Sequence, residues 1–388
     1  MSRVVLALIA LAYIVQGVIA YFQNAPAGGD TAVYQAGAAT LLHGLPLYDS
    51  DTLPFEPAYA QLPFTYTPFA ALLFTPLVVV PSQVAWGILN ALSALALIAV
   101  VYIVLTKVRR PSWLTPEWGA VVLGGAMLLL EPVRVNMDYG QVNLLLMLLV
   151  VLDVLVVKRF GGVLVGVAAA VKLVPLIFVA YFLLVGRTRD ALRAVGAFAG
   201  LQALMFLLTP HSAYRFWTHT VFDSSRIGPT NWSWNQSLGG MVRRFSEQAP
   251  WSQPVAYLIG VVLAAGAAVL VRRYRDRPVY GLLIIGFLSL LVSPVSWVHH
   301  WVWAVPLITV LVTEALCGNK IARWLLPVTV AVFAVPVLRW VPHGSFREYA
   351  WTPAQMVAGN LFVLFPVIVG LVMLVRSSRS RRSLAQVG

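Results

Sequence analysis

The chain has 388 residues, of which 60% are apolar or aromatic (AVILMFWYC) and only 11% are charged. Soluble proteins carry about 25% charged residues, so the composition excludes a soluble enzyme, a fibrous protein and a disordered tail, and it indicates a polytopic membrane protein. In a membrane protein, a net charge of +13 indicates first which side of the bilayer the basic residues face. We therefore expect no nucleic acid partner. The single cysteine, Cys317, excludes a disulfide framework and a cysteine-based metal site.

The apolar runs predict an all-α bundle of about 12 transmembrane helices, because about 20 apolar residues cross the hydrocarbon core. The predicted spans are 4–22, 84–106, 118–131, 141–157, 161–171, 173–186, 190–209, 252–271, 279–295, 300–317, 322–339 and 353–375. The first run could be a signal peptide, but it is not followed by a clear cleavage site, so we expect an uncleaved span. The fifth and sixth are interpreted as a tight pair of short spans on either side of Lys172.

The segment 66–80 decides the topology, because every later loop changes side if it crosses the membrane. A crossing would place the basic residues near 107–110 and 158–159 on the same side as the first long loop, which the positive-inside rule disfavours. We therefore expect 66–80 to be a juxtamembrane element in the first outer loop. Both termini and most of the 27 Lys and Arg residues then lie in the cytoplasm.

With this topology all six histidines and most acidic residues fall on or near the outer face. Groups able to do acid–base chemistry mark reactive sites, so a reaction is expected there. Asp30 follows the first span, ahead of a short interfacial helix predicted over 33–42 that ends at His43-Gly44. Its carboxylate could cap that helix or serve as a general base.

Two interruptions of apolar sequence add polar candidates. Residues 131–143 are predicted to form a short outer turn, after which Gln141 and Asn143 begin an apolar helix; they line a cavity or form an interhelical hydrogen bond. Lys172 must snorkel, pair or face water, and a phosphate would be a fitting counter-ion.

The large outer loop 210–251 mixes aromatic, amide and basic side chains, as sugar sites do. Its candidates are Arg226, Trp232, Trp234, Asn235 and Gln236, although tryptophans also anchor membrane interfaces. His299 and His300 are adjacent, which is poor geometry for one metal ion. The sequence requires no cofactor, and a divalent metal is possible but not indicated by any ligand spacing.

These segments together resemble one family. The segments that carry the resemblance are Asp30 with Val33-Tyr34-Gln35-Ala36-Gly37-Ala38, Gly44 with Leu47-Tyr48, Leu62 to Ala70, Gly140-Gln141-Val142-Asn143, Lys172 with Pro175, Trp234-Asn235-Gln236-Ser237, and Ser296-Trp297 with His299-His300. Over about residues 4–310 the chain resembles glycosyltransferase family 87 of the GT-C superfamily, polyprenol-phosphate-mannose-dependent α-(1→2)-mannosyltransferases of the actinobacterial envelope. The family's usual Pro-Pro after tyrosine is Thr67-Pro68 here.

The resemblance implies a single integral membrane domain over 1–388. Residues 1–209 form a catalytic GT-C-like module with the first outer loop at 23–83, 210–251 form a large outer loop, and 252–388 form C-terminal helices. It also implies a plasma-membrane enzyme with its site on the outer face. There it would transfer mannose, with inversion, from polyprenol-phosphate-mannose to the 2-hydroxyl of a phosphatidylinositol mannoside or another mannosyl glycolipid, among membrane lipids.

The implied roles fall into three groups. Asp30 is the general base, and His299 is the second catalytic residue. Donor and phosphate binding is expected from Lys172, Arg226, His300 and Tyr66. Sugar and acceptor binding is expected from Trp232, Trp234, Asn235, Gln236, Gln141 and Asn143.

Two other functions are compatible with a chain of this kind. One is an arabinofuranosyltransferase that uses a polyprenol-phosphate pentose, for which the fold and the aspartate would be similar. The other is a lipid or glycan transporter. Transporters often contain internal repeats with broken helices, but the two halves of this chain show no repeat, and its charged residues gather at one face.

Overall fold

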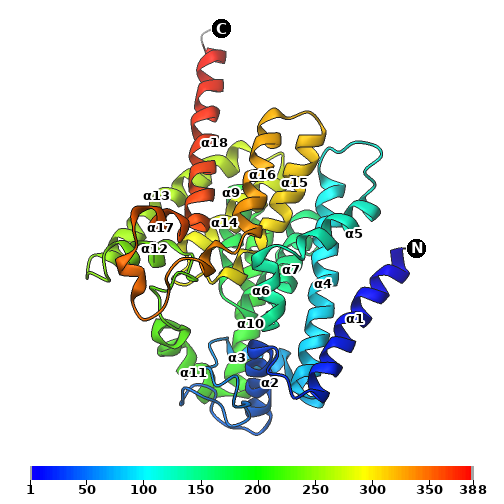
Figure 1. The fold of residues 1–388 in the computed structure, drawn as a ribbon, viewed down its shortest axis with the longest axis vertical. Helices are drawn as coiled ribbons and strands as arrows, with labels where there is room; N and C mark the ends of the chain where they lie inside the picture. Colours follow the sequence, from blue (N-terminus) through cyan, green and yellow to red (C-terminus); the bar gives the residue numbers. More distant parts are fainter. Residues whose placement is uncertain (1, 386–388) are drawn as a thin grey trace.

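The computed structural model describes residues 2–385, and every regular element in that range is a helix (Figure 1). The fold class predicted from composition is therefore confirmed as an all-helical protein. The side chains of the predicted cytoplasmic residues Arg379, Arg381 and Arg382 lie outside what the structure describes. The last helix, α18 (Leu361–Ala385), projects from one end of the bundle.

Six helices are long and apolar enough to cross a membrane, and a bent pair makes a seventh candidate. The six are α1 (Ser2–Phe22), α4 (Ser82–Lys107), α10 (Thr188–Leu208), α13 (Ser252–Arg273), the Val298–Leu316 segment made of η5 (Val298–Trp303) with α15 (Ala304–Leu316), and α16 (Lys320–Ala334) with its continuation to Arg339. Shorter apolar helices are α7 (Asn143–Leu155), η2 (Val174–Ile177) with α9 (Phe178–Leu184), α14 (Pro278–Val292) and the first part of α18.

Several predicted spans differ from the helices that form. The predicted helix 118–131 is α5 (Pro116–Met127), which bends by 77° into α6 (Glu131–Tyr139), so the predicted turn at 131–143 is wrong for most of its length. The predicted span 353–375 is interrupted between α17 (Pro353–Ala358) and α18. The nine residues of α8 (Val163–Val171) rise only about 14 Å, less than the hydrocarbon core requires.

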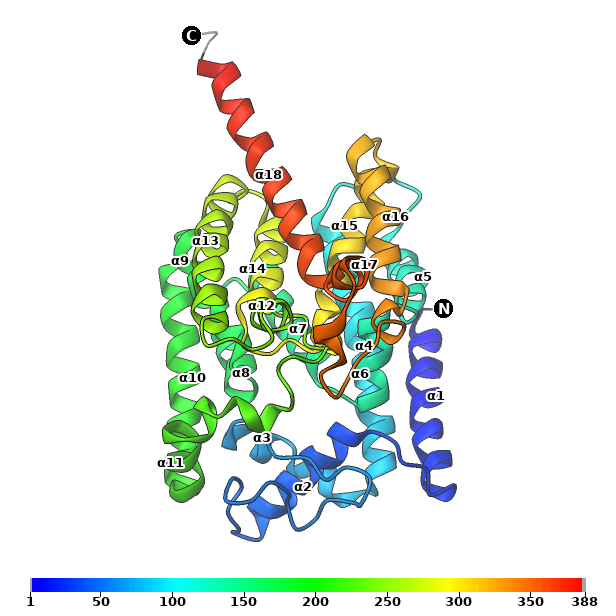
Figure 2. The ribbon, with the colours of Figure 1, turned by 60° about the vertical axis from the view of Figure 1, so that its left-hand side comes forward.

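The first outer loop forms a layer at the end of the molecule opposite α18 (Figure 2). It contains α2 (Gly29–Leu42), α3 (Pro68–Leu73) and η1 (Thr75–Val79). The predicted helix therefore begins four residues earlier than expected, and it ends at His43 as expected. The six residues of α3 are too few to cross a bilayer, which agrees with the prediction that 66–80 is no span.

The connections α4–α5, α13–α14 and α15–α16 lie toward the end from which α18 projects (Figures 1 and 2). These short loops and the helix ends beside them carry the basic residues from Lys107 to Arg110, from Arg272 to Arg277, and Lys320 with Arg323. These basic residues and the first outer loop thus lie toward opposite ends of the bundle.

The large outer loop is organised by a buried arginine. This loop contains α11 (Pro210–Thr218), η3 (Thr220–Phe222), η4 (Ser224–Ile227) and α12 (Leu238–Phe245). Arg244 of α12 is 1% exposed and donates to the carbonyls of Trp232 and Asn235 at 2.7 and 2.9 Å, and to Asn360 Oδ1 at 2.6 Å. Asn360 immediately precedes α18. The C-terminal segment, with η6 (Val337–Arg339) and η7 (Arg347–Ala350), therefore anchors the aromatic part of this loop.

Candidate active site

A large cavity with a volume of about 580 Å³ lies between the first outer loop and the helical bundle. Nine of the twelve predicted site residues line it. They are Asp30, Tyr66, Gln141, Lys172, Arg226, Trp232, Trp234, His299 and His300. The structure thus brings together most of the predicted site residues, although they come from segments up to 270 positions apart (His300 minus Asp30).

Asp30 occupies the first turn of α2, where the helix dipole favours a negative charge. It does not cap the helix, because the N-cap is Gly28, in the left-handed conformation with φ of 66°. The capping role considered from the sequence is therefore wrong. Burial raises the pKa of the Asp30 carboxyl to about 6, while the hydrogen bond from Gln141 and the charge of Lys172 oppose that rise.

Gly140 brings Gln141 beneath Asp30. It ends α6 with φ of +67°, and a Cβ at this position would lie 2.0 Å from Thr31 Oγ1. Thr31 instead donates to the Gly140 carbonyl at 3.0 Å, which ties α2 to the α6–α7 turn. Gln141 Nε2 then donates to Asp30 Oδ2 at 2.5 Å. A glycine is needed here both for the conformation and for the close approach.

Gln141 and Asn143 belong to a hydrogen-bond network inside the protein. Gln141 Oε1 accepts from the hydroxyls of Tyr34 and Tyr66 at 2.9 and 3.0 Å, and Asn143 Nδ2 lies 3.4 Å away. Asn143 does not line the main cavity. Tyr34 is not among the predicted site residues, although it lies four residues after Asp30 and so on the same face of a helix.

Lys172 lies at the break between α8 and η2, in an extended conformation. Its Nζ is 3.1 Å from Asn143 Oδ1 and 2.9 Å from His300 Nε2, and it stands 5.4 Å from the centre of the Tyr66 ring. The lysine therefore does not snorkel to a distant surface. It presents a cation to the same cavity as Asp30, and the two are joined through Gln141 and Asn143.

Several polar atoms in the cavity wall are buried without a hydrogen-bond partner within the described part of the chain. They are Nδ1 and Nε2 of His299, Nε1 of Trp234 and Nε of Arg226. His299 is only 6% exposed, and its ring packs edge-on against Tyr139 at 5.7 Å. Buried polar groups ordinarily have partners, so these atoms fit a polar ligand such as a sugar.

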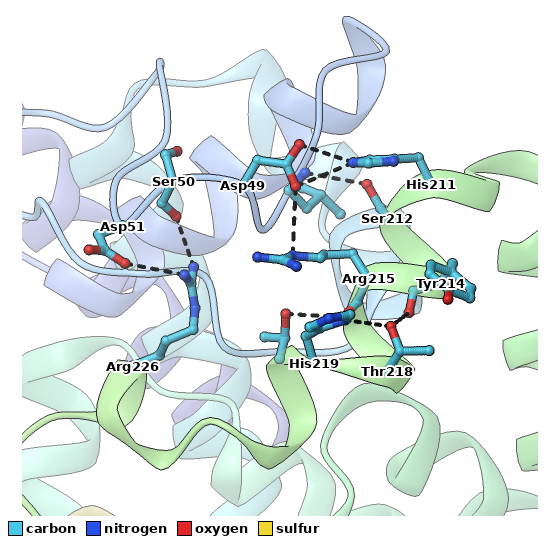
Figure 3. Close-up of polar contacts among 12 residues, drawn as sticks. Asp49, Ser50, Asp51, His211, Ser212, Tyr214, Arg215, Thr218, His219 and Arg226 are labelled. Atoms are coloured by element: carbon cyan, nitrogen blue, oxygen red, sulfur yellow. Dashed lines mark hydrogen bonds and ion pairs between the residues drawn. The ribbon is translucent and has the colours of Figure 1, made fainter.

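One wall of the cavity is tied to the first outer loop by ion pairs (Figure 3). Arg226 donates to Asp51 Oδ1 at 3.2 Å and to the Ser50 carbonyl at 2.9 Å. His211 Nε2 lies 3.0 Å from Asp49 Oδ2. The bonds of Arg226 thereby hold the segment 219–228, which contributes to the cavity wall, against the first outer loop.

Asn235 and Gln236 do not line the cavity. Both are fully buried and bond the backbone of distant segments: Asn235 Oδ1 accepts from the Ser296 amide at 2.9 Å, and Gln236 Nε2 donates to the Gly359 carbonyl at 2.7 Å. In the structure their amide groups hold the loop against these segments and do not reach the cavity. Trp232, by contrast, is 42% exposed beside the cavity.

A narrower apolar pocket shares Lys172, Val174 and His300 with the main cavity. It continues between α7, α9 and α14, where Leu146, Phe178 and Leu290 form part of its wall. An apolar passage therefore begins beside the cationic side chain. Within residues 2–385 no group of three or more His, Cys, Asp or Glu side chains could hold a metal ion.

Comparison with known proteins gives a consistent match. The family model described as Glycosyltransferase family 87 matches residues 64–294. Relatives named polyprenol-phosphate-mannose-dependent alpha-(1-2)-phosphatidylinositol mannoside mannosyltransferase, from Mycobacterium tuberculosis and Mycolicibacterium smegmatis, are each 32% identical. The alignments cover 96% of this chain and 91% of the first relative, and 90% of this chain and 84% of the second.

A further Mycobacterium tuberculosis protein is named polyprenol-phosphate-mannose-dependent alpha-(1-2)-phosphatidylinositol pentamannoside mannosyltransferase. It is 36% identical over 79% of this chain and 72% of its own length. No solved structure matches the chain.

Proposed function

We propose, since the chain belongs to glycosyltransferase family 87, that it transfers mannose from polyprenol-phosphate-mannose to the 2-hydroxyl of a phosphatidylinositol mannoside. The names of its relatives support both substrates. The observation that carries the proposal is the pairing of Asp30 with Lys172 and His300 on one cavity. Such a transfer needs a base for the acceptor and a cation for the leaving phosphate, and both face the same space.

In the proposed reaction, the acceptor oxygen attacks the anomeric carbon of mannose from the face opposite the phosphate. Its proton passes to Asp30, the new glycosidic bond forms, and the bond from the anomeric carbon to the phosphate oxygen breaks. Attack from the opposite face converts a β-linked donor into an α-linked product. General base assistance of this kind contributes about 10²- to 10⁴-fold to the rate.

Polyprenol phosphate leaves with increased negative charge. The ammonium of Lys172 lies 2.9 Å from His300 Nε2, and placing positive charge in advance where negative charge develops is an effective form of catalysis. The apolar pocket that shares these two residues offers room for the first part of the lipid tail. His299, Trp234 and Arg226 supply the unpartnered polar atoms that bond sugar hydroxyls or phosphate oxygens, and Trp232 offers an exposed ring for stacking.

For the membrane arrangement, we propose about 12 crossings with both termini in the cytoplasm and the cavity on the outer side. The basic loops at the α18 end support this orientation under the positive-inside rule. It requires the shorter helices to cross with the six long ones, which a bundle allows where they are covered by neighbours.

The test uses purified protein in liposomes with polyprenol-phosphate-mannose and a mannosyl glycolipid acceptor, and mass spectrometry of the lipids. Asp30→Asn and Asp30→Ala should each lower transfer by at least about 10²-fold, since they remove the base, while gel filtration and inserted yield stay unchanged. Transfer near the wild-type rate in either variant would remove Asp30 as the base. A pentose donor assayed in parallel should give no product.

A further inference from the structure

The hydrogen bonds between Lys172 and Asp30 run in one direction. An ammonium group has three donors and no acceptor, so Asn143 Oδ1, 3.1 Å from Lys172 Nζ, must accept. This fixes the Asn143 amide, whose Nδ2 then faces two acceptors at 3.1 Å: Asn136 Oδ1 and the His299 carbonyl. His300 Nε2 must likewise accept from the lysine.

The fixed Asn143 amide determines how Gln141 is oriented. Its Nδ2 lies 3.4 Å from Gln141 Oε1, which also accepts from the hydroxyls of Tyr34 and Tyr66. The two hydroxyl oxygens also lie 2.8 Å from each other. The three contacts among these two oxygens and Gln141 Oε1 therefore share the two hydroxyl hydrogens. Because all the groups around this position can donate, they favour the orientation in which the carbonyl oxygen of the Gln141 side chain faces them. The NH₂ group of Gln141 then points toward Asp30.

The opposite orientation of Gln141 is unfavourable at both ends. Its carbonyl oxygen would lie against the Asp30 carboxylate, where Nε2 now donates at 2.5 Å. Its NH₂ group would meet the NH₂ group of Asn143. In the observed orientation Gln141 bonds only Oδ2 of Asp30, and within residues 2–385 no hydrogen bond engages Oδ1. That oxygen stays available to an incoming hydroxyl.

We propose that Tyr34 and Asn143 are positioning residues, which hold Gln141 with its NH₂ group toward Asp30 and so fix the carboxylate that accepts the proton. Tyr66 contributes in the same way and lines the cavity as well. Lys172 sets the direction of the whole chain of bonds. This inference rests on the proposed function, because it assigns a purpose only if Asp30 is the base.

Tyr34 is the residue that separates positioning from substrate binding. It is fully buried and does not line the cavity, so its hydroxyl can act on a substrate only through its partners Gln141 and Tyr66. Tyr34→Phe keeps the ring, which stacks on Phe74 at 4.4 Å. The matched control is Tyr280→Phe, which removes a tyrosine hydrogen bond of 2.8 Å to Glu314, remote from the cavity lining.

We expect Tyr34→Phe to lower kcat by about tenfold, because small errors in the position of a reacting group are costly. The KM for donor and acceptor should change by less than about threefold. The acid limb of the kcat/KM profile should move to higher pH, because a loosened Gln141 stabilises the carboxylate less. Tyr280→Phe should match the wild type in all three quantities.

A double-mutant cycle gives the decisive comparison. In a Gln141→Ala background, Tyr34→Phe should have no further effect on kcat or on the pH profile, since Gln141, through which Tyr34 acts on Asp30, is gone and only its bond to Tyr66 remains. An equal effect in both backgrounds would overturn the inference, as would a wild-type pH profile in Tyr34→Phe. Thermal denaturation of each variant identifies losses that come from unfolding, and Asn143→Ser supplies a second test of the same bonds.

The two proposals fail in different ways. Retained transfer in Asp30→Asn would defeat the assignment of the base. An inactive Asp30→Asn together with an unchanged Tyr34→Phe would leave the base in place and defeat only the positioning role.

Discussion

The Asp30 carboxyl shows how burial prepares a base. An exposed aspartate has a pKa near 3.9, so its carboxylate is a weak proton acceptor near neutral pH. Burial raises the pKa to about 6, and the hydrogen bond from Gln141 and the nearby Lys172 keep it from rising further. The group therefore stays ionised at neutral pH and is a stronger base than an exposed aspartate.

This balance predicts a pH dependence. A protonated Asp30 cannot accept a proton, so kcat/KM should fall about tenfold per pH unit below about 6 and level off above it. Lys172→Met removes a positive charge that lowers the pKa of Asp30, so the acid limb should move to higher pH. Initial rates of mannose transfer from about pH 5 to 8 measure both effects. A wild-type profile that is flat through pH 6 would contradict the assignment.

The sequence predicts which residues gather at the site better than it predicts what each contacts. Polar residues in an apolar chain must find a cavity or a partner, and this alone selects Asp30, Gln141, Lys172 and His299. Whether Gln141 bonds a sugar or a carboxylate depends on Tyr34 and Gly140, which come from different elements. That information is tertiary and cannot be inferred from residue type.

At the scale of elements, hydropathy locates the long helices and misplaces the ends of the short ones. The predicted turn over 131–143 is mostly α6. A search for apolar runs overlooks this helix, because polar residues interrupt its sequence and some of them are buried. Asn235 and Gln236 form part of a predicted sugar motif, yet they bond the backbone of distant segments. Motif order identified the family here without revealing which amides face the cavity.

The segment 219–228 provides a prediction at this scale. The side chain of Arg226 is 11% exposed and lines the cavity, whereas that of its partner Asp51 is 87% exposed. An exposed ion pair contributes about 0–1 kcal/mol, so Asp51→Ala should change neither the melting temperature nor kcat/KM by much. Arg226→Ala should raise the KM for a substrate about tenfold or more, because hydrogen bonds to charged groups contribute about 1.5–3 kcal/mol.

Steady-state kinetics with the donor and the acceptor varied separately distinguish the two variants and identify the substrate that Arg226 contacts. Equal losses in Asp51→Ala and Arg226→Ala would show that the tie between the loops matters more than the guanidinium itself.

At the scale of the whole molecule, charge and chemistry are separated between its two ends. Many of the basic residues lie in or beside the loops at the α18 end, and the cavity lies beside the first outer loop. A lipid-linked sugar donor and a glycolipid acceptor both remain in the bilayer, so a cavity bounded by membrane helices gives each of them access. In the proposed orientation the positive-inside rule keeps the basic loops in the cytoplasm and the cavity on the outer side.

The single cysteine makes this orientation measurable. Cys317 follows α15 at the end that carries the basic loops, so a membrane-impermeant maleimide should not label it in intact cells and should label it after permeabilisation. In a Cys317→Ser background, Thr52→Cys places a thiol on an exposed position of the first outer loop, and intact cells should label it. Labelling of Cys317 from outside would invert the topology and place the cavity on the cytoplasmic face.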